Sequence, residues 1–169
     1  EVIDLSTGIT RVMSTSDKVS GEFLVSLPSG SSYALNVSAP GYLFYSENYT
    51  LGKTLKPTDV FNTDIPLNPI EAGERIVLKN IFFSTGSATL EEQSQSELQK
   101  LVEFLEKNPT MKIEVSGHTD DVGADDANMK LSQQRAESVK TYLVGKGIVA
   151  DRIQSKGYGK TKPIASNAT

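Results

Sequence analysis

Two oppositely charged residues, Asp120 and Arg135, have the types and the spacing that could hold a zwitterionic ligand. Asp120 follows an alternating apolar run at 111–115 that predicts a strand, and open α/β sheets bind ligands beyond the carboxyl ends of their strands. Arg135 lies one helical turn from both Leu131 and Val139 on an apolar stripe, where a guanidinium is costly unless an anion or hydrogen-bond acceptors meet it. The pair suits a ligand whose ammonium meets the carboxylate and whose carboxylate meets the guanidinium.

The same spacing also fits an internal salt bridge between Asp120 and Arg135 that only holds the loop, and the residues alone leave both interpretations open. His118 is the only histidine, so a multi-histidine metal site is excluded, and we expect it to orient the turn by hydrogen bonding. No alignment of the nearby acidic cluster with a calcium-binding loop places both the ligands and the glycine at the positions that such a loop requires. No second acid is placed to face Asp120 across a cleft, and the GxGxxG phosphate pattern is absent. We therefore predict a non-enzymatic protein without a metal or cofactor.

Strand and helix signals alternate along the chain after residue 75. The first predicted strand is almost continuously apolar, as expected of a central strand buried on both faces, and Thr89 with Glu92 matches a capping box at the start of the first helix. The order β-α-β-α-β predicts an α/β sandwich with helices covering a mixed sheet. In chain order, these segments are a strand at 76–83, a helix ending at Asn108-Pro109, a strand at 111–115, a helix ending near Val144 and a strand at 152–156.

Separate blocks of this half resemble the signature of the OmpA-like peptidoglycan-binding domain, and they occur in that family's order and spacing. The resemblance covers residues 75–169 and implies the family's α/β fold and non-covalent binding of peptidoglycan. The blocks are Asn80-Ile-Phe-Phe83, Ala88-Thr-Leu90, Gly117-His-Thr-Asp120, Gly123, Asn128, Leu131-Ser132, Arg135-Ala136, Gly157-Tyr-Gly159 and Lys162-Pro-Ile-Ala165.

The resemblance also implies residue roles. In that family the matching aspartate and arginine clamp the free end of diaminopimelic acid in the peptidoglycan stem peptide, so Asp120 takes the ammonium and Arg135 the carboxylate. Loop amides at the helix N-terminus would serve a second carboxylate. Where many members carry Asp-Phe-Asp after the first strand, this chain has Ser84-Thr-Gly86, which leaves open any ligand contact from that loop. The predicted peptidoglycan-binding residues are Asp120, Arg135, Asn128, Thr119, Asp121, Val122 and Phe83.

Residues 1–70 have a different sequence pattern, with short alternating apolar runs at 23–27 and 33–37 separated by Gly/Pro turns. This pattern predicts a β-sandwich. Their turn residues resemble a carboxypeptidase-regulatory-like (transthyretin-type) module, which implies a spacer or interaction unit without peptidase activity. A Pro- and Gly-containing joint follows. We predict an α+β chain with two domains: a β-sandwich at 1–70, incomplete at its N-terminus, and an OmpA-like domain at 71–169, lacking the family's last helix and strand.

Composition excludes several classes of protein. The net charge of −4 over 169 residues, with no basic run, argues against nucleic acid as a partner. Zero cysteines exclude disulfides, and no apolar stretch has the length of a membrane helix, so we expect membrane attachment only through regions absent here. The order of the two modules resembles outer-membrane-associated proteins of the Bacteroidetes type, some of them in secretion machinery. We predict a periplasmic, outer-membrane-associated wall anchor that also contacts envelope or secretion-complex proteins; a purely structural interaction module is the competing hypothesis.

Overall fold

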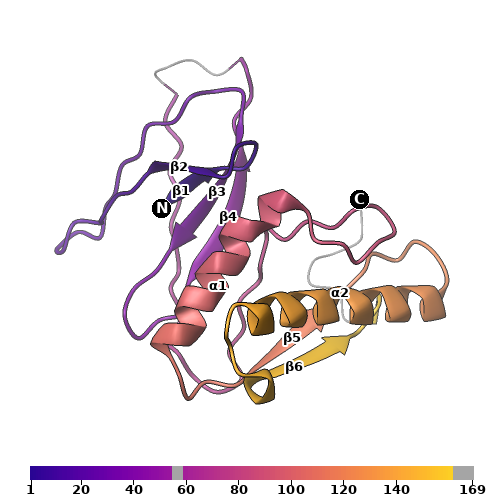
Figure 1. The fold of residues 1–169 in the computed structure, drawn as a ribbon. Helices are drawn as coiled ribbons and strands as arrows, with labels where there is room; N and C mark the ends of the chain where they lie inside the picture. The colour runs from indigo at the N-terminus through magenta and orange to yellow at the C-terminus, as the bar shows by residue number, and fades with distance from the viewer. Residues whose placement is uncertain (55–58, 162–169) are drawn as a thin grey trace. The chain divides into compact units, whose positions relative to one another are not determined.

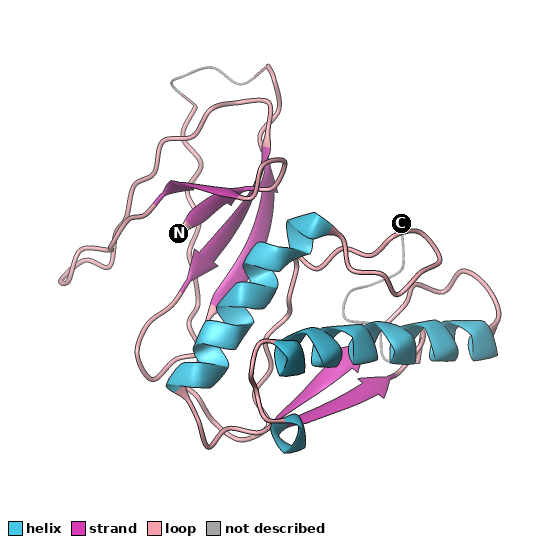
Figure 2. Ribbon diagram, viewed as in Figure 1, coloured by secondary structure: helices cyan, strands magenta, loops and turns pink. Residues whose placement is uncertain are grey.

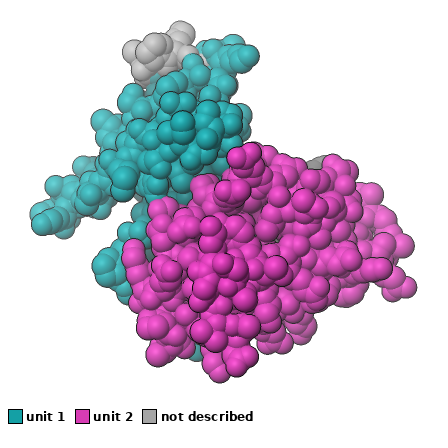
Figure 3. Space-filling view, viewed as in Figure 1, with its two compact units in different colours: residues 1–80 teal, residues 81–169 magenta. Residues whose placement is uncertain are grey.

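The computed structural model describes residues 1–54 and 59–161. The predicted block at 162–165 lies outside the described residues. The chain divides into two compact units, Glu1–Asn80 and Ile81–Thr169 (Figure 3). The boundary between the units therefore falls later in the chain than the one predicted at 70/71.

The first unit is built on one antiparallel sheet (Figure 2). The strand order is β2-β1-β3-β4, and β3 in the interior of the sheet contributes Tyr33 and Leu35 to a core cluster with Val2. Ala34 and Asn36 between and beside them are buried as well, so β3 is covered on both faces and its burial does not follow the alternation of apolar residues. The strands are β1 (Val2–Asp4), β2 (Ile9–Val12), β3 (Ser32–Val37) and β4 (Tyr45–Thr50).

The second sheet of the predicted β-sandwich is not seen in the described part of this unit. The segment at 23–27, expected as a strand, has no strand pairing. Its side chains Val25 and Leu27 still pack against the core cluster, and the Tyr33 hydroxyl donates to the Pro28 carbonyl at 2.8 Å. The alternating pattern therefore marked side chains that cover the sheet, but a ladder also needs a neighbouring backbone, which the pattern cannot specify.

Asp4 carries a buried negative charge at the end of β1. One carboxylate oxygen accepts hydrogen bonds from the Ser6 amide (2.9 Å) and hydroxyl (2.6 Å), and the other accepts from Arg11 Nε (3.2 Å) and Nη2 (2.9 Å). These bonds, Ser6 first and Arg11 second, lower the pKa of Asp4 from 3.8 to about 2. The ionised form is therefore the one that the fold stabilises.

We expect the stability of the first unit to depend on pH through Asp4. Because the folded pKa lies below the ordinary value, the stabilisation is present above about pH 4 and is lost as the pH falls from about 4 to 2. Asp4→Asn should cost roughly 2 kcal/mol at pH 7, as for hydrogen bonds to a charged group. Urea unfolding at pH 7, 4, 3 and 2 measures this difference, which should shrink in that window. A constant difference between wild type and variant at all four values would contradict the assignment.

The second unit contains a parallel pair of strands, and α2 packs against both of them (Figure 1). β5 and β6 pair in register from Ile113 with Ile153 to Gly117 with Gly157. α1 ends at Lys107, directly before the predicted stop at Asn108-Pro109, and α2 ends at Gly145, one residue after the predicted Val144, while β5 lies slightly later than expected. The elements are the 3-10 helix η1 (Glu92–Ser94), α1 (Gln95–Lys107), β5 (Ile113–Gly117), α2 (Asp125–Gly145), the 3-10 helix η2 (Ala150–Arg152) and β6 (Ile153–Gly157).

The predicted first strand at 76–83 and the mixed sheet are both wrong for the residues that the structure describes. This segment forms only an isolated bridge between Phe83 and Leu90, and the described sheet is the parallel β5–β6 pair. A central strand needs neighbours on both sides, whereas here the Phe82 amide donates to Ser94 Oγ at 2.8 Å and its carbonyl accepts from the Glu91 amide at 3.0 Å. The apolar run is thus fastened to the start of α1. The expected capping box is also wrong, since η1 begins after Glu91 without a side-chain cap.

The face of α2 that packs inward includes Val139 and Leu143 of the predicted stripe, but toward the start of the helix it continues through small residues rather than through Leu131 and Arg135. Ser132 and Ala136 are buried together with Val139 and Leu143. Small side chains are required because the strands approach the helix backbone very closely. A Cβ on Gly117 would lie 2.1 Å from the Ser132 carbonyl oxygen, and one on Gly157 would lie 2.4 Å from the Gln133 nitrogen.

Candidate functional site

The loop from β5 to α2 starts from a fixed position because backbone pairing continues beyond the strands. The Tyr158 amide donates to the Gly117 carbonyl at 2.9 Å, and the Thr119 amide donates to the Gly159 carbonyl at 3.0 Å. Gly159 lies against the start of α2, where an added Cβ would be 3.2 Å from the Met129 nitrogen. Thr119, a predicted contact residue, is therefore half-buried and anchored through its backbone.

The rest of the loop is closed by two side chains. Asp120 Oδ1 accepts from the Val122 amide at 3.3 Å, which forms an Asx turn, and Asn128 Nδ2 donates to the Val122 carbonyl at 2.9 Å. Gly123, with φ of 98°, completes the turn between them. Asn128 is only 7% exposed, so it contributes as a residue that shapes the loop. Asp120, Asp121 and Val122 remain exposed.

Among the acidic residues of this region, Asp125 has a cationic partner. Lys160 Nζ lies 2.6 Å from Asp125 Oδ1. The hydrogen bond to Asp125, followed by the charges of Asp125 and Asp121, raises the pKa of Lys160. Asp120 forms no ion pair with any residue that the structure describes, so its charge is left for another partner.

Arg135 is held by a turn that precedes α1. Its Nε donates to the Ser87 carbonyl at 3.1 Å, and its guanidinium carbon lies 4.9 Å from the centroid of the Phe83 ring. Within the described ranges it makes no ion pair, so the internal Asp120–Arg135 salt bridge is not formed. The structure thus brings together two predicted site residues, Phe83 and Arg135, and adds Ser87, which sequence reasoning missed because a carbonyl contact has no residue-type signature.

The structure differs from the hydrogen-bonding role expected of His118. Its ring stacks on Tyr158 with centroids 5.5 Å apart and an interplanar angle of 12°, while its buried Nδ1 has no hydrogen-bond partner in the described chain. The turn is held by the Thr119 backbone instead. The Tyr158 hydroxyl in turn donates to Glu114 at 2.8 Å, which fixes the ring on which His118 stacks.

Two further residues that the sequence did not single out individually fasten α2 to the loop after β6. Ser132 Oγ, fully buried, accepts from the Gly159 amide at 2.9 Å and donates to the Met129 carbonyl at 2.8 Å. Gln133 Oε1 accepts from the Gly157 amide at 2.7 Å. Ser132 belongs to the Leu131-Ser132 block and Gln133 follows it directly, but nothing in their spacing indicates which other block they contact.

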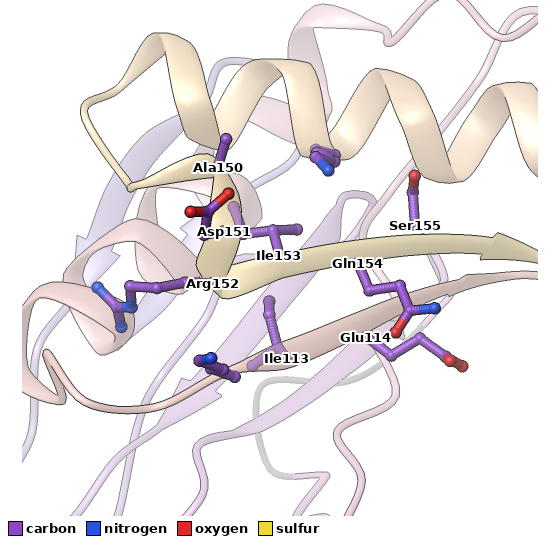
Figure 4. A pocket seen from close by; sticks show the side chains of 10 residues that line it. Ile113, Glu114, Ala150, Asp151, Arg152, Ile153, Gln154 and Ser155 are labelled. Carbon is purple, nitrogen blue, oxygen red and sulfur yellow. The ribbon is translucent and has the colours of Figure 1, made fainter.

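A separate depression of about 590 Å³ lies where β5 and β6 begin, whereas the loop with Asp120 follows the end of β5 (Figure 4). Its lining includes charges of both signs and neither Asp120 nor Arg135. Arg152 in this lining already donates hydrogen bonds of 2.8–2.9 Å to the carbonyls of Leu105, Asn108 and Met111. We therefore do not assign the ligand to this depression.

Two other features are absent from the described ranges. No group of His, Cys, Asp and Glu side chains there is arranged to hold a metal ion. None of the helices in those ranges has the length and apolar character needed to cross a bilayer.

Residues 82–169, just over half of the chain, match the model of the OmpA family. The chain belongs to the OmpA family. The match begins beside Phe83 and includes the loop with Asp120 and the helix with Arg135.

Two curated relatives and one solved structure are similar to parts of this chain. Outer membrane protein A of Bordetella avium is 42% identical over 88 residues, which are 52% of this chain and 45% of the relative. Outer membrane porin F of Pseudomonas fluorescens is 38% identical over 101 residues, which are 60% and 31% of the two chains. The structure of the peptidoglycan-associated lipoprotein from Burkholderia pseudomallei shares 32% identity with a TM-score of 0.47, over 50% of this chain and 72% of that one. The chain spans less than half the length of these two curated relatives.

Proposed function

We propose that the second unit binds peptidoglycan non-covalently through the diaminopimelate of the stem peptide and anchors an outer-membrane or periplasmic assembly to the cell wall. Membership in the OmpA family supports this function. The observation that carries it is the pair of charges that the protein leaves without an ionic partner in its described part, Asp120 after β5 and Arg135 on α2. The free end of diaminopimelate bears an ammonium and a carboxylate on one carbon, and it complements such a pair.

In this assignment Asp120 receives the ammonium and Arg135 the carboxylate. Thr119, Asp121 and Val122 line the exposed loop beside them, and Asn128 maintains the loop's shape. The proposed interaction is recognition and not catalysis, since the sequence pattern places no second acid to face Asp120 across a cleft.

The protein acts in the periplasm in association with the outer membrane. The names of its relatives, an outer membrane protein and an outer membrane porin, support this location. The first unit serves as a spacer or interaction module that connects the wall-binding unit to an envelope assembly, a role suggested by the resemblance of its turn residues to a carboxypeptidase-regulatory-like module.

Calorimetric titration tests the proposed function directly. A tripeptide that ends in diaminopimelate should bind the 169-residue chain at least tenfold more tightly than the same tripeptide with lysine, which lacks the extra carboxylate, because one charge-assisted bidentate contact is lost. Co-sedimentation with purified diaminopimelate-type sacculi provides a second measurement. Equal affinity for both peptides, or no binding by folded protein, would refute the proposal.

A further inference from the structure

We infer that Phe83 and Ser87 are positioning residues that orient Arg135, so that only the outer Nη1/Nη2 end of its guanidinium is offered to a carboxylate. This inference rests on the proposed function for the identity of the ligand. The orientation itself is a property of the free protein. It assigns the turn at 83–90 a role in carboxylate recognition without any direct contact to the ligand.

Only one of the N–H groups of the Arg135 guanidinium is used by the described part of the protein. An arginine has five N–H groups, of which one is on Nε. In this structure Nε donates to the Ser87 carbonyl, and no hydrogen bond from Nη1 or Nη2 reaches a described residue. A carboxylate can therefore form two parallel bonds only with the Nη1/Nη2 end, since the Nε side is occupied.

The Ser87 carbonyl that accepts this bond belongs to a turn closed by its own hydrogen bonds. The Ser84 amide donates to the Thr89 carbonyl at 3.2 Å, and the Ser87 amide donates to the Ser84 carbonyl at 2.9 Å. Ser87 Oγ also bonds Thr89 Oγ1 at 3.0 Å, and Phe83 bridges to Leu90 across the base of the turn. The direction of the Ser87 carbonyl is thus set by contacts within the turn, none of which involves Arg135.

The turn that holds Arg135 carries no charged side chain between residues 84 and 90. Residues 84–90, Ser-Thr-Gly-Ser-Ala-Thr-Leu, contain no acid. A carbonyl and an aromatic face attract a guanidinium through partial charges, so they orient Arg135 without neutralising it. An acidic side chain at the same place would compete with the ligand. The departure from the family's Asp-containing pattern at Ser84-Thr-Gly86 therefore favours an arginine that keeps its full charge for a carboxylate.

The first test uses the free protein. In ¹⁵N–¹H spectra of arginine side chains, the Nε–H of Arg135 should give a slowly exchanging signal in the wild type and in Phe83→Tyr, which keeps the ring. Phe83→Leu should remove this protection. Gly86→Ala should weaken it by a different route: its Cβ meets no atom within 4 Å, so the substitution acts only by straining a φ of 64° and displacing the turn. Retained protection in both Phe83→Leu and Gly86→Ala would overturn the inference.

The second test measures affinity for three tripeptides that end in diaminopimelate, in its carboxamide form, or in lysine. Phe83→Leu should weaken the first about fivefold and leave the other two within twofold, while Phe83→Tyr should match the wild type on all three. An equal loss on all three peptides would indicate a purely structural role for Phe83 and overturn the inference. Protection of Nε–H without binding of any peptide would support the orientation of Arg135 and refute the proposed function, so the two failures are distinguishable.

Discussion

Gly117→Ala is expected to destabilise the second unit by at least about 3 kcal/mol, the upper end of the usual cost of overpacking a core. The added Cβ would lie 2.1 Å from the carbonyl oxygen of Ser132 and 2.9 Å from its carbonyl carbon. Both are backbone atoms of α2, so no side-chain rotation relieves the contact. The whole helix must move away from β5, which also disturbs the hydrogen bonds that Ser132 makes with Gly159 and Met129.

Gly145→Ala provides the matched control for this substitution. Gly145 lies on α2, the helix against which Gly117 packs; an added Cβ there meets no atom within 4 Å, and its φ is not in the left-handed region. We expect a change within about 1 kcal/mol, with stabilisation from the reduced freedom of the unfolded chain. Because the chain has no tryptophan, urea unfolding is best followed by circular dichroism of the helices. A Gly117→Ala variant within 1 kcal/mol of the control would show that the close packing of helix on strand is not required.

Arg135→Gln is expected to reduce affinity for the diaminopimelate tripeptide by about tenfold to a hundredfold, because it removes a charge-assisted hydrogen-bonding partner. The same substitution should have little effect on the lysine tripeptide, which lacks the carboxylate that Arg135 is proposed to meet. Asp120→Asn should show the reciprocal pattern, with a loss for the tripeptide that has a free ammonium and none when that amine is acetylated. Each charge is thus tested against the ligand group that it is proposed to meet.

Asp126→Asn separates this specific recognition from the general field of the acidic loop. Asp126 lies in the first turn of α2 and is exposed, so its removal changes the net charge by the same amount as Asp120→Asn. We expect an effect below twofold on all peptides, measured by calorimetry at low and at 0.5 M salt, where long-range attraction is screened. If Arg135→Gln weakened the lysine and diaminopimelate peptides equally, the assignment of Arg135 to the extra carboxylate would be wrong.

The parts of the fold that could be predicted from the sequence are those set by local signals. The ends of α1 and α2 follow from Asn108-Pro109 and Gly147, whose conformational restrictions act within a few residues. The strand predicted at 76–83 does not form, because an apolar run does not specify which backbone lies beside it and a ladder needs that neighbour. The same reason explains 23–27, which covers a sheet without joining one.

The candidate site was predictable only to the level of residue types. The resemblance pointed to the loop of Asp120 and the helix of Arg135, because it depends on residue types, which can be read from the sequence. The atom that meets Arg135 is a backbone carbonyl 48 residues away, and every residue has one. Likewise, the periodicity of α2 indicated an apolar stripe, whereas the contact surface is set by Gly117 and Gly157 on the strands, which call for small residues opposite them.

The backbone bond from Thr119 to Gly159 has a consequence for the speed and entropy of recognition. Together with the Asn128–Val122 bond, it fixes the loop at both ends in the free protein. A ligand therefore meets a surface whose conformational entropy has already been lost during folding, and association does not have to include an ordering step. Recognition of this kind proceeds by simple docking, with affinity determined by how long the ligand's charges stay in place rather than by how often the loop closes.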